Sequence, residues 1–210
     1  MRNETHPAVP RVDGILFDLL MAVMNSVQTW SEAAQDRRGL TWRDAVTARM
    51  IASDAYVPYE TLVAEAASQL GLPRTASADL FTRWASMQPR PDAEALSRLK
   101  LPFAFVTNCS SELARTAAAR SGLSPQFTLS AEEAGWFKPD PRIYQAACRR
   151  LGSAIERTLF VSGSAYDADG ASLAGLPTVL VLRRADQRPR NTAIFVAGSL
   201  SDALDVIDRA

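Results

Sequence analysis

The stretch Ile15-Leu16-Phe17-Asp18-Leu19-Leu20 contains an apolar run that is interrupted by one carboxylate. Val12–Phe17 is mostly apolar, as expected of a strand that is covered on both faces within a parallel sheet. In open α/β sheets, ligands bind just beyond the carboxyl ends of the strands. We therefore expect Asp18 to face the reaction crevice, although a lone Asp in this position more often caps the next helix.

Strands and helices are predicted to alternate in the second half of the chain. The expected helices begin at capping residues or prolines and end at Gly122, Gly152 and Gly175. This alternation predicts an α/β fold with a Rossmann-like parallel sheet. The expected strands after the first are Phe103–Thr107, Gln126–Leu129, Thr158–Ser162, Thr178–Leu182 and Ala193–Val196.

The intervening segment has helical periodicity and no convincing strand. Its first helix is expected to close at Gly39, with Thr41 capping the second, and a further helix is expected over Asp92–Lys100 on the return to the sheet. The sequence therefore predicts a core domain formed by residues 1–26 and 91–210. A helical cap domain, residues 27–90, is inserted after the first strand.

Composition excludes several classes of function. Lys and Arg together number 23, as do Asp and Glu, so no basic surface indicates a nucleic-acid partner. No apolar run is long enough to span a bilayer, and polar residues 1–11 do not resemble a signal peptide. Cys109 and Cys148 lack metal-type spacing, which favours a cytoplasmic location. The single histidine, His6, lies in the polar leader, which argues against Ser-His or Cys-His catalysis.

Polar residues occur near several predicted strand ends. Asp18 follows the first strand, the pair Thr107-Asn108 ends the next, and Ser162, Ser164 and Asp167 lie at a later one. Lys138 precedes the helix that begins at Pro141, and its ammonium would stabilise an ionised Asp18. Carboxylates, hydroxyls, an amide and an ammonium at one sheet edge form a plausible nucleophilic site.

These residues and their order resemble the haloacid dehalogenase superfamily, and within it the L-2-haloacid dehalogenases of type II. The resemblance covers about residues 15–205, and the helical insertion lies where that family carries its cap. The four matching stretches are Leu16–Leu19, Val106–Ser110, Lys138–Tyr144 and Phe160–Asp167.

The resemblance assigns a role to each candidate residue. It implies that Asp18 attacks C2 of a 2-haloacid, expels halide and forms an aspartyl ester that water then opens. Arg43 in the cap would receive the halide or hold the substrate. Thr107 and Asn108 would bind the substrate carboxylate. The residues expected to steady the nucleophile and help position the water are Lys138, Tyr144, Ser162 and Asp167. Tyr144, Ser162 and Ser164 are also expected among the substrate-binding residues.

The first and fourth motifs depart from the family pattern. Leu20 replaces the acid/base Asp of the phosphatases and the Tyr usual in dehalogenases, and Met21-Ala22 replaces the usual Gly-Thr. Gly163 stands in place of one metal-holding acid, and Ser164 stands where dehalogenases tend to have Asn. Halide leaves unprotonated, so dehalogenation needs neither the missing acid nor a metal. The apolar first motif suggests a larger apolar substrate or another reaction.

The sequence therefore predicts a metal-independent hydrolase that uses Asp18, a small-molecule substrate and no cofactor. One alternative is an enzyme of the same fold that catalyses a non-hydrolytic elimination or cyclisation of an apolar metabolite. Another is a catalytically silent binding protein, and a Mg²⁺-dependent phosphatase is the weakest interpretation. The dehalogenase resemblance also suggests a homodimer. Apolar cap residues that could serve an interface or the core are Trp30, Val57, Leu62 and Leu70.

Overall fold

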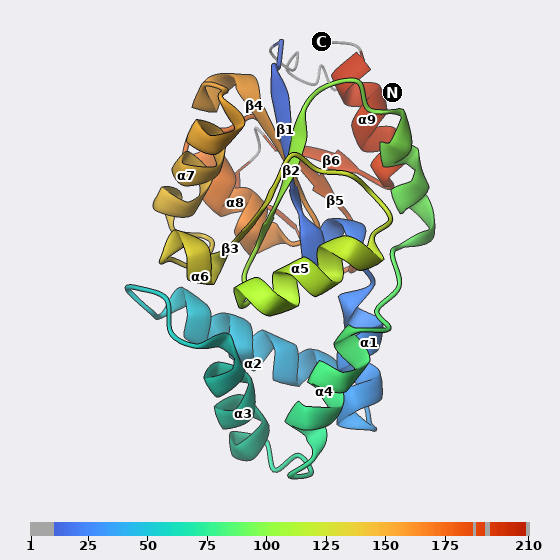
Figure 1. Cartoon of the computed structure of the whole chain (residues 1–210), viewed down its shortest axis with the longest axis vertical. Coiled ribbons are helices and arrows are strands. Elements are labelled where there is room, and N and C mark those ends of the chain that lie inside the picture. Colours follow the sequence, from blue (N-terminus) through green and yellow to red (C-terminus); the bar gives the residue numbers. More distant parts are fainter. Residues whose placement is uncertain (1–10, 187, 192–193, 209–210) are drawn as a thin grey trace.

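The computed structural model describes residues 11–186, 188–191 and 194–208. Within them lies one six-stranded parallel sheet in the order β3-β2-β1-β4-β5-β6, which confirms the predicted fold class (Figure 1). The predicted polar leader, including His6, lies almost wholly outside the described residues. The strands are β1 (Gly14–Asp18), β2 (Phe103–Thr107), β3 (Thr128–Ser130), β4 (Thr158–Ser162), β5 (Thr178–Val181) and β6 (Phe195–Ala197).

Strand β1 is central because it pairs with β2 on one side and β4 on the other. Ile15 lies opposite Phe103 in one register and opposite Leu159 in the other. All five residues of β1 are buried. A β-carbon built on Gly14 would lie 2.7 Å from Leu151 Cδ2, so α7 packs directly on the start of this strand. The apolar run thus forms the doubly covered strand that its composition predicts.

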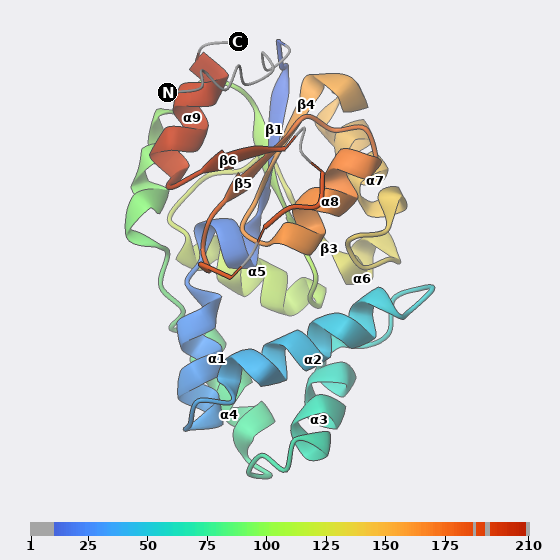
Figure 2. The same ribbon diagram turned by 180° about the vertical axis from the view of Figure 1, so that it is seen from behind.

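Helices cover both faces of the sheet, and a separate helical layer lies beyond one of its ends (Figures 1 and 2). The layer beyond the sheet consists of α1 (Ser26–Ala34), α2 (Gly39–Ile51), α3 (Tyr59–Gln69) and α4 (Ala76–Trp84). The remaining helical elements are η1 (Leu19–Val23), η2 (Pro91–Arg98), α5 (Ser111–Arg120), α6 (Ala131–Ala134), α7 (Pro141–Leu151), η3 (Ile155–Arg157), α8 (Ala165–Leu173) and α9 (Leu200–Asp208).

Helix α7 shows why its sequence forms the predicted element. Pro141 occupies its first turn, where a missing N–H is harmless, and the Asp140 side chain accepts a hydrogen bond from Arg142 N. The helix ends at Gly152, whose φ of 73° is a conformation that glycine adopts without strain. The bounds of this helix and of β2 and β4 are those predicted.

The start of the cap differs from the sequence prediction. Helix α1 ends at Ala34, and Gln35 has the left-handed backbone conformation. Gly39 begins α2 rather than ending α1, and Thr41 lies inside α2 instead of capping it. A β-carbon on Gly39 would lie 2.5 Å from Ser31 Cα, so this glycine permits the close approach of two helices. The prediction was wrong because glycine can serve either purpose.

Other differences are local. The segment after the cap forms a 3-10 helix, η2, rather than an α-helix, and β3 lies two residues later than its predicted start. The short elements η1, η3 and α6 were not predicted. The last predicted strand, Ala193–Val196, corresponds to β6, which begins at Phe195 and ends one residue later, at Ala197; Ala193 lies outside the described residues. The Ser199 hydroxyl accepts a hydrogen bond from Asp202 N, as expected of the residue that caps α9.

The connections into and out of the cap run side by side. Met24 and Pro89 form an isolated antiparallel bridge. Asn25 N donates to Gln88 O at 2.9 Å, and Arg90 N donates to Val23 O at 2.8 Å. Because these contacts fall near the expected boundaries, we propose that the domains are residues 1–26 with 91–210 and residues 27–90.

The cap has its own apolar interior. Trp30 packs edge-on against Trp42, and both rings are buried. Leu62 is also buried, and Val57 and Leu70 pack against the same core. Packing within the chain therefore accounts for the apolar cap residues. Across the described ranges, no helix is both long and apolar enough to cross a membrane.

Candidate active site

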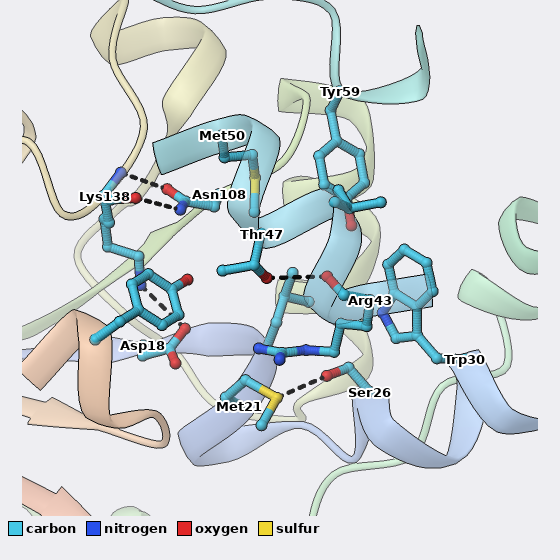
Figure 3. A pocket seen from close by; sticks show the side chains of 13 residues that line it. Asp18, Met21, Ser26, Trp30, Arg43, Thr47, Met50, Tyr59, Asn108 and Lys138 are labelled. Atoms are coloured by element: carbon cyan, nitrogen blue, oxygen red, sulfur yellow. Dashed lines mark hydrogen bonds and ion pairs between the residues drawn. The ribbon is translucent and has the colours of Figure 1, made fainter. Parts of the chain in front are cut away.

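Asp18 lies at the carboxyl end of β1, where the chain turns into η1. Its side chain is 6% exposed and lines a cavity between the sheet and the cap. It makes no capping hydrogen bond to η1. Instead, Oδ1 accepts a hydrogen bond of 3.1 Å from Lys138 Nζ (Figure 3). The helix-capping interpretation of Asp18 is therefore wrong, and its carboxylate belongs to a polar cluster.

The Lys138 ammonium lies between two carboxylates. Nζ donates to Asp18 Oδ1, to Asp167 Oδ2 at 2.6 Å and to Val106 O at 3.2 Å. The side chain is 1% exposed, and all three of its N–H donors are used. Burial alone would lower the pKa of Lys138, but Asp167 and Asp18 together raise it above its usual value. Lys138 is thus a fixed cation beside Asp18.

Asp167, at the start of α8, is held by two side chains. The Tyr144 hydroxyl donates to Asp167 Oδ1 at 2.5 Å, and Lys138 binds the other oxygen. Burial raises the pKa of Asp167 to about 6, although Lys138 and the Tyr144 hydrogen bond both favour its ionised form. At neutral pH Asp167 and Lys138 therefore form an ionised pair, although burial disfavours the charge on Asp167.

Asn108 organises the loop that carries Lys138. Its Nδ2 donates to Lys138 O at 2.8 Å, and its Oδ1 accepts from Lys138 N at 2.7 Å, as Figure 3 shows. Asn108 lines the cavity, whereas Thr107 is fully buried with Oγ1 3.6 Å from Cys109 Sγ. That these two side chains bind a substrate carboxylate stays a prediction. The geometry adds a positioning role for Asn108 that its motif did not suggest.

Ser162 and Ser164 form a small turn behind the cavity. Ser162 Oγ donates to Ser164 O at 2.9 Å and accepts from Ser164 N at 3.1 Å. Ser164 Oγ is buried and has no hydrogen-bond partner among the described residues. Neither serine belongs to the cavity lining. Their predicted contact with substrate or water stays a prediction.

Gly163 packs against the first-motif turn. A β-carbon built on it would overlap the backbone of Met21 and Ala22. No side chain, and therefore no metal-binding carboxylate, fits at this position with the turn as it is. Backbone packing explains why glycine stands where the resemblance would place an acid.

Arg43 comes to the cavity from the cap helix α2. It is 8% exposed, and Nη1 lies 3.3 Å from Asp44 Oδ1. Figure 3 shows its guanidinium extending from α2 toward the side of the cavity that holds Asp18 and Met21. Asp44 also forms an ion pair of 3.0 Å with Arg184 of the core. The structure thus brings the predicted cap arginine to the same cavity as Asp18.

The cavity is small, with about 30 Å³ of space, and has both polar and apolar walls. In this structure that space is close to the volume of one water molecule. The walls include apolar residues, and a larger apolar substrate stays a prediction. The lining consists of Asp18, Leu20, Met21, Ser26, Trp30, Arg43, Val46, Thr47, Met50, Tyr59, Asn108, Lys138 and Tyr166.

Three aromatic residues of this lining were not predicted as site residues. Tyr166 directly precedes Asp167 in the fourth matching stretch, so its position beside the site could have been inferred from the sequence. Tyr59 and Trp30 lie on cap helices, and only the packing of the cap brings them to the cavity. Their local sequence carries no comparable signal.

The chain matches known proteins over most of its length. The model of the family described as haloacid dehalogenase-like hydrolase matches residues 12–175. (S)-2-haloacid dehalogenase H-109 of Pseudomonas putida is 30% identical over 200 residues, which cover 82% of this chain and 87% of that protein. (S)-2-haloacid dehalogenase 4A of Burkholderia cepacia is 37% identical over 111 residues, covering 50% of this chain and 48% of that protein.

Solved structures share the fold. The L-2-haloacid dehalogenase from Xanthobacter autotrophicus, with chloropropionic acid covalently bound, has a TM-score of 0.79 and 21% identity. That match covers 94% of this chain and 98% of the other. The chain spans about half the length of the first curated relatives that it matches.

Proposed function

Because the chain belongs to the haloacid dehalogenase-like hydrolases, we propose that it is a metal-independent hydrolase in which Asp18 displaces halide from a 2-haloacid. The observation that carries this proposal is the setting of Asp18. One oxygen is held by Lys138, while the carboxylate lines the cavity that the cap arginine enters. A carboxylate that is held in place beside a cavity is suited to nucleophilic attack.

In the first step, Asp18 Oδ2 donates an electron pair to C2 of the acid. A C–O bond forms, the carbon–halogen bond breaks, and the halide leaves with its bonding electrons. Attack from the side opposite the halide inverts the configuration at C2. No proton is transferred, which is consistent with Leu20 at the position where phosphatases carry an acid/base residue.

In the second step, water attacks the carbonyl carbon of the aspartyl ester. The acyl C–O bond breaks, and the 2-hydroxyacid leaves with one proton of the water on its new hydroxyl. The other proton passes to solvent, and the water oxygen stays in the regenerated Asp18 carboxylate. Lys138 lies 3.1 Å from Asp18 Oδ1, where its positive charge stabilises the negative charge that develops on the ester oxygen. Asp167 and Asn108 hold Lys138 through its ammonium and its backbone.

Arg43 is proposed to stabilise the departing halide. Its guanidinium reaches the cavity and has one ion-pair partner, Asp44, among the described residues. The names of the curated relatives support a 2-haloacid as substrate. The chloropropionic acid bound covalently in the Xanthobacter enzyme supports an ester intermediate.

The donor set at the sheet edge does not fit a Mg²⁺ ion. The fixed Lys138 ammonium lies between Asp18 and Asp167, the two acids that would bind the metal. Gly163 offers no third carboxylate because its α-carbon packs on Met21. Hard divalent ions need several oxygen ligands at short distance, so these residues favour chemistry without a metal.

The test is halide release from racemic 2-chloropropionate without added metal. Wild type is expected to release chloride from one enantiomer, and Asp18→Asn is expected to release none. Asp13→Asn is the matched control, because Asp13 is exposed and pairs with Arg157 away from the cavity. Turnover by Asp18→Asn at the wild-type rate would overturn the proposal.

A single turnover in H₂¹⁸O distinguishes the ester route from its alternatives. The water oxygen enters Asp18 in the ester mechanism, so mass spectrometry is expected to find the label in the Asp18 peptide. Direct attack of water on the substrate would put the label only in the hydroxyacid. A non-hydrolytic elimination would release halide with no label in either. Binding without halide release would favour the silent binding protein.

We also propose a cytoplasmic homodimer. Buried, unpaired Cys109 and Cys148 suit a reducing compartment. The dimer rests on the dehalogenase resemblance, and light scattering coupled to size-exclusion chromatography tests it. A mass near 22.8 kDa, that of one chain, would count against it.

A further inference from the structure

Most polar groups of the cavity lining are already used by the protein. Thr47 Oγ1 donates to Arg43 O, and Ser26 Oγ donates to Met21 Sδ. Asn108 uses both amide atoms on the backbone of Lys138, whose own ammonium is fully engaged. These groups shape the cavity but offer a ligand few new hydrogen bonds.

Two phenols of the lining remain available. The hydroxyls of Tyr59 and Tyr166 have no hydrogen-bond partner in the part of the chain that the structure describes, yet neither is sealed from the cavity. The indole N–H of Trp30, another residue of the lining, also has no hydrogen-bond partner among the described residues. A phenol or indole that is largely buried usually finds a hydrogen-bond partner. These unpaired donors therefore indicate that a ligand in the cavity supplies the missing hydrogen-bond acceptor.

Packing holds the ring of Tyr59 in place, whereas its hydroxyl has no hydrogen-bond partner among the described residues. The ring packs edge-on against Trp84 at 6.1 Å, and Tyr59 N donates to the Tyr56 hydroxyl. Figure 3 shows the Tyr59 ring descending from the cap toward the helix of Arg43. Arg43 and Tyr166 line the same cavity as Tyr59. Removal of this hydroxyl should leave the packing intact.

Both phenols act as donors at ordinary pH. Burial raises the pKa of Tyr166 to about 12. Burial also raises the pKa of Tyr59 well above its usual value. The two O–H groups therefore stay protonated and can donate to an oxygen acceptor across the working pH range.

The charges around the cavity indicate an uncharged acceptor. Both cations of the lining already have carboxylate partners, Lys138 in Asp18 and Asp167 and Arg43 in Asp44. The substrate carboxylate adds one further negative charge. A second carboxylate would be buried without a cation of its own, which is unfavourable. An ether, carbonyl or hydroxyl oxygen can accept from a phenol without that penalty.

We infer that the preferred substrate is an acid whose side chain carries an uncharged oxygen acceptor, which Tyr59, assisted by Tyr166 and Trp30, binds at the cap side of the cavity. This inference rests on the proposed function for the carbon that Asp18 attacks. It adds a specificity determinant that distinguishes such acids from alkyl acids of the same shape.

Binding of unreactive acids tests the subsite apart from turnover. The pairs are 3-methoxypropionate with pentanoate and methoxyacetate with butyrate, which differ only by oxygen in place of a methylene group. Titration calorimetry on wild type is expected to show about tenfold tighter binding of the oxygen acid in at least one pair. Equal affinities in both pairs, a preference for the alkyl acids, or no measurable binding would overturn the inference.

Tyr59→Phe identifies the residue responsible. It is expected to reduce the oxygen preference to less than about threefold, since the analogue then gains no hydrogen bond from this position. Tyr56→Phe is the matched control, because that hydroxyl contacts Tyr59 N and does not line the cavity. An unchanged preference in Tyr59→Phe, or an equal loss in Tyr56→Phe, would contradict the assignment.

Turnover separates this inference from the proposed function. Chloride release is compared for 2-chloro-3-methoxypropionate and 2-chloropentanoate. Release from both at similar kcat/KM, together with equal binding of the unreactive pairs, would support the dehalogenase and refute the subsite. Selective binding of the oxygen acids without release from any 2-chloroacid would support the subsite and refute the dehalogenase.

Discussion

The Tyr144 hydroxyl lies 2.5 Å from Asp167 Oδ1 and donates a hydrogen bond to it. It is one of the groups that favour the ionised form of Asp167 against burial, which raises the pKa of that carboxyl to about 6. Ionised Asp167 in turn holds Lys138 in the ion pair beside Asp18. The chain of contacts therefore links a phenol on α7 to the proposed nucleophile on β1.

This relationship predicts an acid limb in the pH profile. As the pH falls through about 6, Asp167 takes up a proton and releases its charge–charge contact with Lys138, so kcat/KM is expected to fall. Tyr144→Phe removes a hydrogen bond that lowers the pKa of Asp167, so the limb should move to higher pH. Steady-state rates between pH 4.5 and 8 measure the shift. An unmoved limb in Tyr144→Phe would show that another group titrates.

Lys138→Met is expected to destabilise the protein strongly. The change leaves Asp18 and Asp167 as neighbouring buried carboxylates without a cation, a loss of about 3–5 kcal/mol at pH 7.5. Both carboxyls would then have a raised pKa when folded, so the folded state binds more protons and the loss should shrink as the pH falls. Urea unfolding at pH 5 and 7.5 measures this. Lys100→Met, at an exposed position, is the control and should change little.

Arg43→Met should act on the chemical step. Removal of a charged group that stabilises a leaving anion is expected to lower kcat by about 10²–10³-fold. The loss should be larger for 2-chloropropionate than for 2-bromopropionate, because bromide leaves more readily without assistance. Arg49→Met, six residues along the same helix, is the control. Equal losses for both halides would argue that Arg43 holds the carboxylate instead.

Gly163→Ala tests the packing against the first motif. The new methyl group would overlap the backbone of Met21, and relieving that overlap is expected to lower the free energy of unfolding by about 1–3 kcal/mol. Activity should fall as well, because η1 directly follows Asp18. Gly122→Ala is the comparison, since its β-carbon meets open space and only its φ of 68° is unfavourable. The Gly122→Ala variant should lose about 1 kcal/mol of its free energy of unfolding but keep its activity.

The sequence predicted the sheet well because burial leaves a strong local pattern. The runs of β2 and β4 are apolar and end at Thr107 and Ser162, and the structure has those bounds. Gly39 shows the limit of such reasoning. Its role depends on the close approach of the start of α2 to Ser31 in α1, which no local pattern encodes.

The candidate site was predictable where residues follow strand ends. Asp18, Lys138 and Asp167 meet as expected because parallel strands place their carboxyl ends at one edge. Tyr59 could not be found this way, since its position follows from how the cap helices pack on the core. The motif of Asn108 suggested only a contact with substrate. The two hydrogen bonds of its amide with the backbone of Lys138 are seen only in the structure.

The bridge between Met24 and Pro89 makes the helical insertion a module with adjoining ends. A segment that leaves and rejoins its host at neighbouring points can be exchanged without altering the path of the remaining chain. The sheet, with its carboxylates and ammonium, then serves as the reaction platform, and the insertion is the part that can be changed to alter ligand choice. Grafting a foreign helical module between residues 24 and 89 is thus a direct way to redesign selectivity.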